Sequence, residues 1–323
     1  MSLVGAVVIG RNEGARLKRC LTSLAPQVAH LVYVDSGSRD DSVAFAHSIG
    51  ARVVQLDTQT PFTAARARNE GFEALMEITD CELVQFIDGD CGVEPDWIAK
   101  ASAQMNKDPA LGLVTGWRRE IYPDNSIYNA LCDVEWNRPV GLIKACGGDM
   151  MVRAAAFDDV GGFDPTVIAA EDDEFCQRLT AAQWQLLRIP ENMTLHDANM
   201  LHFGEWWKRA ERSGHGFAQV GDLHPRYFTR ERKRVLVFGA ILPALALLGL
   251  LFSGMLLLGV ILAYGLSYGR TLLGLKHEGV IERPLLYQLA GLLSLSKLPN
   301  MLGMIRYYWR KRAGHAMRII EYK

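Results

Sequence analysis

The 323-residue chain lacks the cysteine patterns of a disulfide scaffold or a standard zinc module, since its six cysteines include no C-x-x-C pair. Scattered cysteines are typical of a reducing compartment. Thirty glycines and 12 prolines are too few for a collagen-like or low-complexity chain. The residues after Met1 include no basic segment and no small-residue cleavage site. We therefore expect no secretory signal peptide, and a first half that stays in the cytoplasm.

Positive charge is scarce in the first part of the chain. Residues 1–230 carry 22 Lys and Arg against 32 Asp and Glu, whereas residues 231–323 carry 13 against 4. The acidic part argues against a nucleic-acid partner. The basic and very apolar remainder favours a membrane.

The first 90 residues alternate between short apolar runs and segments with helical spacing. This alternation predicts an α/β fold with a mainly parallel sheet. The expected strands are 3–10, 31–34, 52–56 and 83–87, and the expected helices are 14–24, 40–49 and 64–76. Further along, the pattern predicts a helix at 97–105, a strand at 111–115 and a helix at 171–182, with loops at the glycine pairs 147–148 and 161–162.

Polar clusters follow three of the predicted strands. They are Arg11-Asn12-Glu13, Asp35-Ser36-Gly37-Ser38 and Asp88-Gly89-Asp90. Ligands of parallel sheets bind outside the carboxyl ends of the strands, so these clusters are candidate binding loops. Asp35 can accept a hydrogen bond from a base or ribose, and Gly37 lets a backbone approach the ligand. The alternative is an ordinary strand–helix turn.

Two acidic clusters are candidates for catalysis. Asp88 and Asp90 are two residues apart, so on an extended segment their side chains point to the same side. Two carboxylates on one side suit Mg²⁺ or Mn²⁺. The alternative is that the segment is an ordinary turn. His196 is a candidate third metal ligand, or a hydrogen-bond donor to a phosphate. The alternative is a loop residue without such a role. Glu171–Glu174 either begins a helix stabilised by its dipole or supplies a general base. Arg68, taken alone, is no more than an exposed helical arginine.

The composition changes sharply near residue 230. Five residues, Arg230–Arg234, form a charged segment, and the 35 residues from Val235 to Gly269 carry no charge. One membrane span needs about 20 residues, so we favour a hairpin at 235–275 over a single span. An interfacial helix at 284–305 and a basic tail would follow, with a partial third span as the alternative. The predicted domains are 1–229 and 230–323.

Six segments together resemble inverting family-2 glycosyltransferases of the GT-A type. They are Val7–Glu13, Val34–Asp40, Ala67–Gly71, Phe86–Asp90, Gly147–Asp164 and Ala170–Asp172, which stand in the family's order. The resemblance covers about residues 3–200. It implies a GT-A domain that uses Mn²⁺ or Mg²⁺ and a nucleotide-diphosphate sugar, with single-displacement transfer to an acceptor hydroxyl.

Residue chemistry and resemblance together assign four roles. The general base is Asp172, as the Asp of the family's E-D motif. The nucleotide-sugar residues are Arg11, Asn12, Glu13, Asp35, Gly37, Arg68 and Asp88. The metal ligands are Asp88, Asp90 and His196, and the acceptor-side residues are Gly148, Asp149 and Glu171.

The processive members' Q-x-x-R-W motif is absent, so we expect one sugar per acceptor. The apolar tail suggests a lipid-linked or cell-envelope glycan acceptor and a place on the cytoplasmic face of the inner membrane; a purely anchoring tail is the alternative.

Competing functions are an inactive nucleotide-sugar-binding scaffold and a sugar nucleotidyltransferase. The second would need a basic, Gly-rich first loop, which Gly10–Gly14 matches poorly. An NAD-dependent oxidoreductase would need a G-x-G-x-x-G motif in the same loop, and the motif is absent from it.

Overall fold

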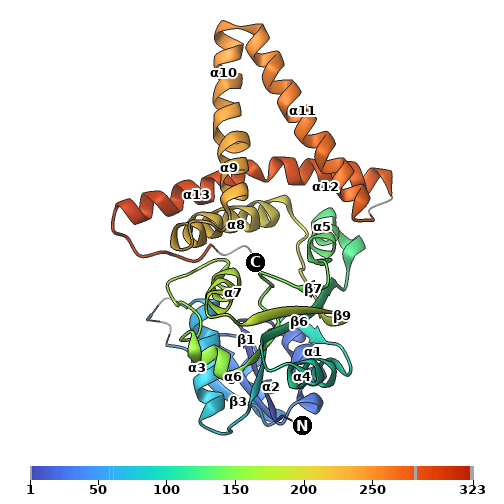
Figure 1. The fold of residues 1–323 in the computed structure, drawn as a ribbon, viewed down its shortest axis with the longest axis vertical. Coiled ribbons are helices and arrows are strands. Elements are labelled where there is room, and N and C mark those ends of the chain that lie inside the picture. Colours follow the sequence, from blue (N-terminus) through green and yellow to red (C-terminus); the bar gives the residue numbers. More distant parts are fainter. Residues whose placement is uncertain (1, 58, 61, 280–281, 321–323) are drawn as a thin grey trace. The chain divides into compact units, whose positions relative to one another are not determined.

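A computed structural model describes residues 2–57, 59–60, 62–279 and 282–320. It divides into two compact units (Figure 1). The first comprises residues 1–122 and 135–198, and contains the sheet. The second comprises residues 123–134 and 199–323, and is helical. The predicted boundary between 229 and 230 stays a prediction.

The first half of the sheet follows the sequence pattern closely. Its strands lie in the order β3-β2-β1-β4 and are all parallel. Their bounds are β1 (Val4–Gly10), β2 (His30–Asp35), β3 (Arg52–Gln55) and β4 (Leu83–Asp88), connected by α1 (Ala15–Leu24), α2 (Ser42–Ser48) and α3 (Ala64–Met76). Each predicted element of this region is confirmed to within a few residues.

Strand β1 is apolar at nearly every position because both of its faces are buried. Val8 packs in one core cluster with Leu17 of α1, and Val7 packs in the other with Leu75 of α3. Helix α3 approaches the sheet very closely at Gly71, where an added Cβ would lie 2.3 Å from Val7 Cγ1. Glycine there sets the height of α3 above the strand ends.

The expectation of a mainly parallel sheet is wrong for the second half. Beyond β4 the order continues β8-β6-β9-β5, and β8 is antiparallel to both β4 and β6, while β5 and β7 are antiparallel to β9. These strands are β5 (Cys91–Val93), β6 (Leu111–Glu120), β7 (Gly141–Leu142), β8 (Met150–Arg153) and β9 (Gln185–His196). Strand β9 was not predicted because Pro190 and its polar residues interrupt any apolar period. Bulges against β6 accommodate it.

Helices α4 (Trp97–Lys107) and α7 (Glu171–Ala181) lie where they were predicted, and both glycine pairs are in loops. The short helices α5 (Ile127–Trp136) and α6 (Ala154–Asp159) were not predicted.

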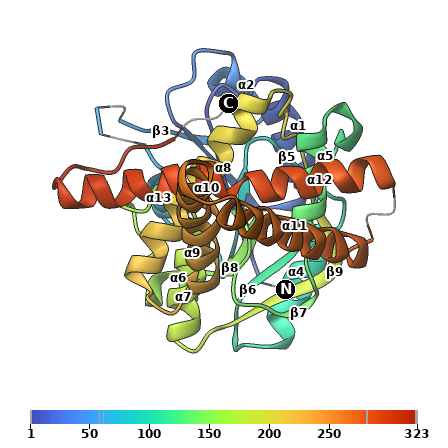
Figure 2. The same ribbon diagram turned by 90° about the horizontal axis from the view of Figure 1, so that it is seen from above.

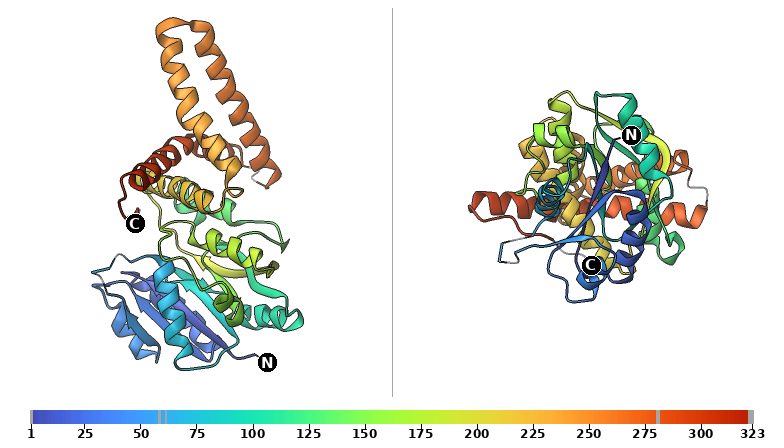
Figure 3. Two further views of the ribbon diagram at one scale, coloured as in Figure 1. Left: turned by 60° about the vertical axis from the view of Figure 1, so that its left-hand side comes forward. Right: turned by 90° about the horizontal axis from the view of Figure 1, so that it is seen from below.

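In the second unit, two long apolar helices form a hairpin (Figure 3). One runs from Thr229 to Phe252 and consists of α9 (Thr229–Leu236), a π-helical turn (Val237–Ile241) and α10 (Leu242–Phe252). The other is α11 (Gly254–His277). Each has 24 residues and is long and apolar enough to cross a membrane. Ser253 separates them and caps α11 by accepting a hydrogen bond from the Leu256 amide.

The π-helical turn lies just before Pro243. The Leu242 amide donates to Val237, five residues earlier, so the next bond of this pattern would join residue 243 to Phe238, and proline has no N–H to make it. The Tyr264 hydroxyl of α11 donates to the Phe238 carbonyl oxygen at 2.6 Å instead. One side chain thus satisfies the backbone group that the proline leaves open, and joins the two helices of the hairpin.

The predicted single helix at 284–305 is wrong. Two helices occupy this region, α12 (Arg283–Leu295) and α13 (Lys297–Arg312), which are separated at Ser296 and lie end to end in Figure 2. Pro299 lies in the first turn of α13, where helices tolerate proline. Helix α13 packs along α8 (Phe203–Leu223), and Gly214 and Gly303 allow the two backbones to meet.

Candidate active site

A buried arginine connects the end of β4 with the start of α7. Arg68 donates from Nη2 to Asp88 Oδ1 at 2.7 Å and from Nη1 to Glu171 Oε1 at 2.9 Å. Only 2% of its side chain is exposed. Burial alone would lower the pKa of Arg68, but the two carboxylates raise it above its ordinary value. Arg68 therefore stays charged and joins two of the sequence motifs.

A second arginine reaches the same strand end from β6. Arg118 Nη2 lies 2.8 Å from Asp149 Oδ2 and 3.5 Å from Asp88 Oδ2. Burial would raise the pKa of Asp88, but Arg68 and Arg118 outweigh it and lower the pKa. Asp88 is thus held as a carboxylate between two guanidinium groups.

Asp149 is fully buried and fixes the backbone of the site. Its Oδ1 accepts the Asp88 amide at 3.0 Å, and its Oδ2 accepts the Thr194 hydroxyl at 2.8 Å. Just before it, Gly148 leaves no room for a side chain, because an added Cβ would lie 2.2 Å from Arg68 Nη2. These two predicted acceptor-side residues therefore lie directly against the Asp88 cluster.

The start of α7 holds four consecutive acids. Glu171 is paired with Arg68, and Asp172 Oδ1 accepts the Asp173 amide at 2.9 Å. Burial, Glu171 and Asp173 raise the pKa of Asp172 well above its ordinary value, which Arg68 only partly offsets. A carboxylate with a raised pKa is a better proton acceptor, as a general base requires.

The first two polar loops hold each other in place. The Asn12 amide donates to Ser38 Oγ and its side-chain Oδ1 accepts the Arg39 amide, each at 2.8 Å. Asn12 adopts a left-handed conformation, with φ of 55°. Asp35 Oδ2 accepts the amides of Gly37 and Ser38, and Gly37 has φ of 89°. The structure therefore gives Asp35 and Gly37 the turn geometry that the sequence left as an alternative.

The other two residues of the first loop contact neighbouring side chains, and Arg11 is exposed whereas Glu13 is mostly buried. The Arg11 guanidinium lies 4.7 Å from the Phe62 ring centre, and Glu13 pairs with Arg16 at 2.8 Å. Their predicted contacts with a nucleotide stay predictions.

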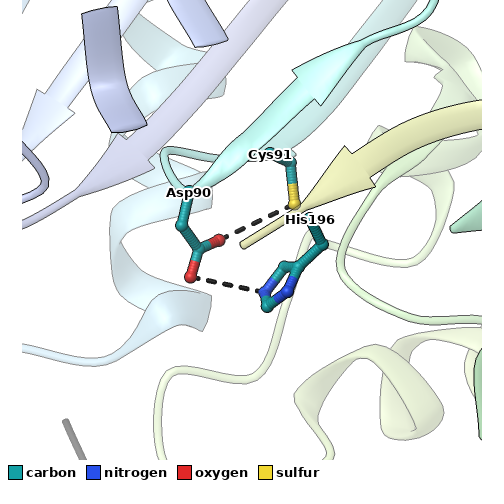
Figure 4. Close-up of side chains that lie close together, drawn as sticks. All are labelled: Asp90, Cys91 and His196. Atoms are coloured by element: carbon teal, nitrogen blue, oxygen red, sulfur yellow. Dashed lines mark hydrogen bonds and ion pairs between the residues drawn. The ribbon is translucent and has the colours of Figure 1, made fainter. Parts of the chain in front are cut away.

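A separate group of donor atoms lies at the turn after β4 (Figure 4). Asp90, Cys91 and His196 are all buried, and one ligand atom from each lies within 4.8 Å of the other two. Asp90 Oδ2 is 3.3 Å from His196 Nε2, and Asp90 Oδ1 is 3.7 Å from Cys91 Sγ. Burial alone would lower the pKa of His196, but Asp90 and Glu120 raise it.

The three predicted metal ligands therefore do not lie together as one group. Asp90 and His196 come together, whereas Asp88 faces the two arginines. Sequence reasoning missed Arg118, Cys91 and Glu120. Arg118 had a usable signal, because it is a basic residue shortly after the predicted strand at 111–115. Cys91 and Glu120 had none, since their partner His196 is distant in the chain.

The mixed sheet, with helices on both faces and charged residues at its strand ends, has a GT-A fold. The family model described as glycosyl transferase family group 2 matches residues 83–272, more than half of the chain, and the model described as glycosyl transferase family 2 matches residues 6–147. The chain belongs to glycosyltransferase family 2.

Curated relatives are more distant. The pre-mycofactocin glycosyltransferase of Mycobacterium tuberculosis is 25% identical over 237 residues, which are 69% of this chain and 48% of that protein. A TPR repeat-containing protein of Synechococcus elongatus is 30% identical over 139 residues, 43% of this chain and 33% of that protein. The chain therefore spans a third to a half of the length of these relatives.

Solved structures show the same fold. A mannosyltransferase from Pyrobaculum calidifontis, solved with GDP-mannose and Mn²⁺, superposes with a TM-score of 0.61 at 16% identity, covering 96% of this chain and 88% of that one. TarS of S. aureus, residues 1–349, superposes with a TM-score of 0.51 at 13% identity, covering 97% and 92%.

Replacing Arg68 tests the bridge. Arg68→Gln leaves Asp88 and Glu171 without their shared cation, and loss of one partner of a buried ion pair costs about 3–5 kcal/mol. We expect that loss in the free energy of unfolding, measured by urea titration of the full chain in detergent. The control Arg52→Gln breaks the exposed pair with Glu77 and should cost less than about 1 kcal/mol. Equal losses in the two variants would contradict the bridge.

Asp172 makes stability depend on pH. The unfolded carboxyl has a pKa of about 3.9. Because the folded pKa is higher, the native state binds more protons between the two values, and its stability falls as the pH rises through that window. Asp172→Asn removes this penalty. We expect the variant to melt above wild type at neutral pH, with the difference vanishing below about pH 4. Exposed Asp158→Asn is the control, and a variant less stable than wild type at pH 7 would refute the assignment.

Proposed function

We propose that this glycosyltransferase moves a sugar from a nucleotide-diphosphate donor to a hydroxyl of a lipid-linked or cell-envelope glycan, by a metal-dependent single displacement with inversion. The observation that carries the proposal is the Arg68 bridge. Arg68 pairs with Asp88 at the end of β4 and with Glu171 in the first turn of α7. Asp172, the next residue of that turn, belongs to the same network of charges.

Asp90 and His196, with Asp88 nearby in sequence, would hold Mn²⁺ or Mg²⁺. The Asp90 carboxylate is the type of ligand that Mn²⁺ and Mg²⁺ prefer, and the His196 Nε2 atom lies 3.3 Å from it. When bound, the ion supplies Lewis-acid stabilisation of the departing diphosphate. Arg68 and Arg118 add positive charge beside Asp88, where negative charge increases as the sugar leaves.

Asp172 is proposed to remove the proton from the acceptor hydroxyl. Its carboxylate takes that proton as the acceptor oxygen forms a bond to the anomeric carbon and the bond to the diphosphate oxygen breaks. One displacement inverts the configuration and needs no protein nucleophile. The raised pKa of Asp172 matches this role, and Gly147 lies beside it without a side chain to obstruct the acceptor.

The apolar hairpin supports a membrane-delivered acceptor. The family match extends to residue 272, through α10 and most of α11, so these helices belong to the matched region. We propose that the catalytic domain is residues 1–229, that residues 230–323 are integral to the inner membrane, and that both flanks of the hairpin face the cytoplasm. The excess of basic residues in 231–323 supports this orientation.

A donor panel tests the reaction. Full-length protein in detergent, with Mn²⁺ or Mg²⁺, is given UDP-, GDP- and dTDP-sugars with and without a membrane lipid extract. We expect nucleoside diphosphate release from one donor, loss of release with EDTA, and stimulation by lipid. Release without lipid stimulation would refute the lipid acceptor, and release that survives EDTA would refute metal dependence. No release from folded protein would favour a binding scaffold.

Asp172→Asn tests the base. Loss of a general base typically lowers the rate by about 10²–10⁴-fold, so we expect that loss in kcat with an unchanged donor Kd measured calorimetrically. The neighbouring Asp173→Asn is the matched control and should retain activity. A large loss of donor affinity in Asp172→Asn would argue for donor binding and against the base.

A further inference from the structure

We propose that the base of the apolar hairpin is a binding surface for anionic phospholipid headgroups, formed by Arg230, Lys233 and Arg234 of α9 together with Arg312 of α13. The inference rests on the membrane placement in the proposed function and adds the class of lipid that this part of the chain selects. It is independent of the sugar, the metal ion and the general base.

The cations of α9 gather on one exposed face of the helix. Arg230, Lys233 and Arg234 have the i, i+3 and i+4 spacing that brings side chains together, and all three are exposed. Val235 is instead buried, in a small cluster with Tyr307 of α13. Packing of α9 through Val235 therefore leaves its basic face uncovered.

These cations lack acidic partners. Among the residues that the structure describes, no carboxylate forms an ion pair with the three cations of α9 or with Arg312. Lys311, by contrast, pairs with Asp222 of α8. Helix α9 carries four basic residues and one acid, and like charges at helical spacing repel each other. An anion bound at this face would relieve that repulsion.

The same helix places its cations at the depth of lipid headgroups. The continuous apolar helix from Thr229 to Phe252 has the cations near its start and no charge from Val235 onwards. This uncharged part is about 27 Å long at the usual helical rise, close to the roughly 30 Å of a bilayer's hydrocarbon core. Val237 and Ile241, just beyond the cations, are 37% and 44% exposed. Charge therefore gives way to hydrocarbon-compatible surface within one or two turns.

Helix α13 adds an interfacial surface to the base of the hairpin. It contacts α9 and the π-helical turn, and α12 and α13 run across the base of the hairpin in Figures 1 and 2. Its face away from α8 exposes Leu302, Ile305 and Trp309 by 43%, 50% and 61%, and Arg312 continues that face. An exposed apolar stripe with a tryptophan and a terminal cation is typical of a helix that lies in a membrane interface.

A phospholipid fits this surface better than a free anion does. The cations are exposed side chains, with exposed apolar side chains directly beside them. A free phosphate would use the cations and leave the apolar residues in water, whereas a lipid offers a phosphate and hydrocarbon together. Anionic lipids of a cytoplasmic leaflet also attract basic segments that adjoin a span. Charge and apolar area together therefore select an anionic lipid.

A lipid titration tests the surface. Full-length protein in uncharged detergent is titrated with short-chain phosphatidylglycerol, short-chain phosphatidylcholine and inorganic phosphate, and each Kd is measured calorimetrically. We expect phosphatidylglycerol to bind most tightly, with a preference that declines as salt is added. In Lys233→Gln/Arg234→Gln its affinity should fall at least about fivefold, the loss expected for one basic residue near an anionic surface, while the phosphatidylcholine affinity is unchanged.

The control Lys100→Gln/Lys107→Gln removes the same charge from exposed positions of α4 and should keep the wild-type preference. Equal affinities for the two lipids in wild type, or equal losses in the two double variants, would overturn the proposal. Inorganic phosphate that binds as tightly as phosphatidylglycerol would show a free-anion site and overturn the lipid assignment. If the α9 variant fails to fold, Arg312→Gln and the salt dependence of wild type decide the question.

The titration contains no sugar donor, so its result is separate from that of the donor panel. Turnover of a donor with equal affinities for the two lipids would refute this inference alone. A phosphatidylglycerol preference in folded protein that turns over no donor would refute the proposed function alone.

Discussion

The arrangement of the unit that contains the sheet depends on one buried arginine with two carboxylate partners. Arg68 is almost fully buried, and a buried cation is tolerable only when its charge is matched and its donors are used. Asp88 on β4 and Glu171 on α7 supply the matching charges. The relative positions of α3, which carries Arg68, the end of β4 and the start of α7 must therefore be kept. Gly71 and Gly148 are parts of the same constraint. The first lets α3 approach the sheet, and the second leaves space for the guanidinium.

The charges at this strand end are also distributed unequally. Asp88 has two arginines and a lowered pKa, whereas Asp172 has acidic neighbours and a raised one. Carboxyl groups of the same kind are thus given different tendencies to hold a proton by their neighbours alone. The proposed mechanism needs this difference, because it uses Asp88 as a fixed negative charge and Asp172 as a proton acceptor.

Much of this was readable from the sequence, and the reason is local. Strands β1, β2 and β4 are largely apolar runs buried on both faces, and each polar motif directly follows its strand in the sequence. Arg68, Asp88 and Glu171 were named, although their contact was not. What sequence reasoning missed depends on partners far apart in the chain. Strand β9 exists through its pairing with β6, and Cys91 and Glu120 gain meaning only when β9 delivers His196 to them.

Asp149 gives the site its resistance to deformation. One carboxylate holds the last amide of β4, a hydroxyl of β9 and the guanidinium that extends from β6, so three strands are tied at a single point in the interior. Such a tie prevents the strands from separating at their ends. The strand ends therefore form a stiff frame, while the Arg68 and Arg118 guanidinium groups reach this frame only through their side chains.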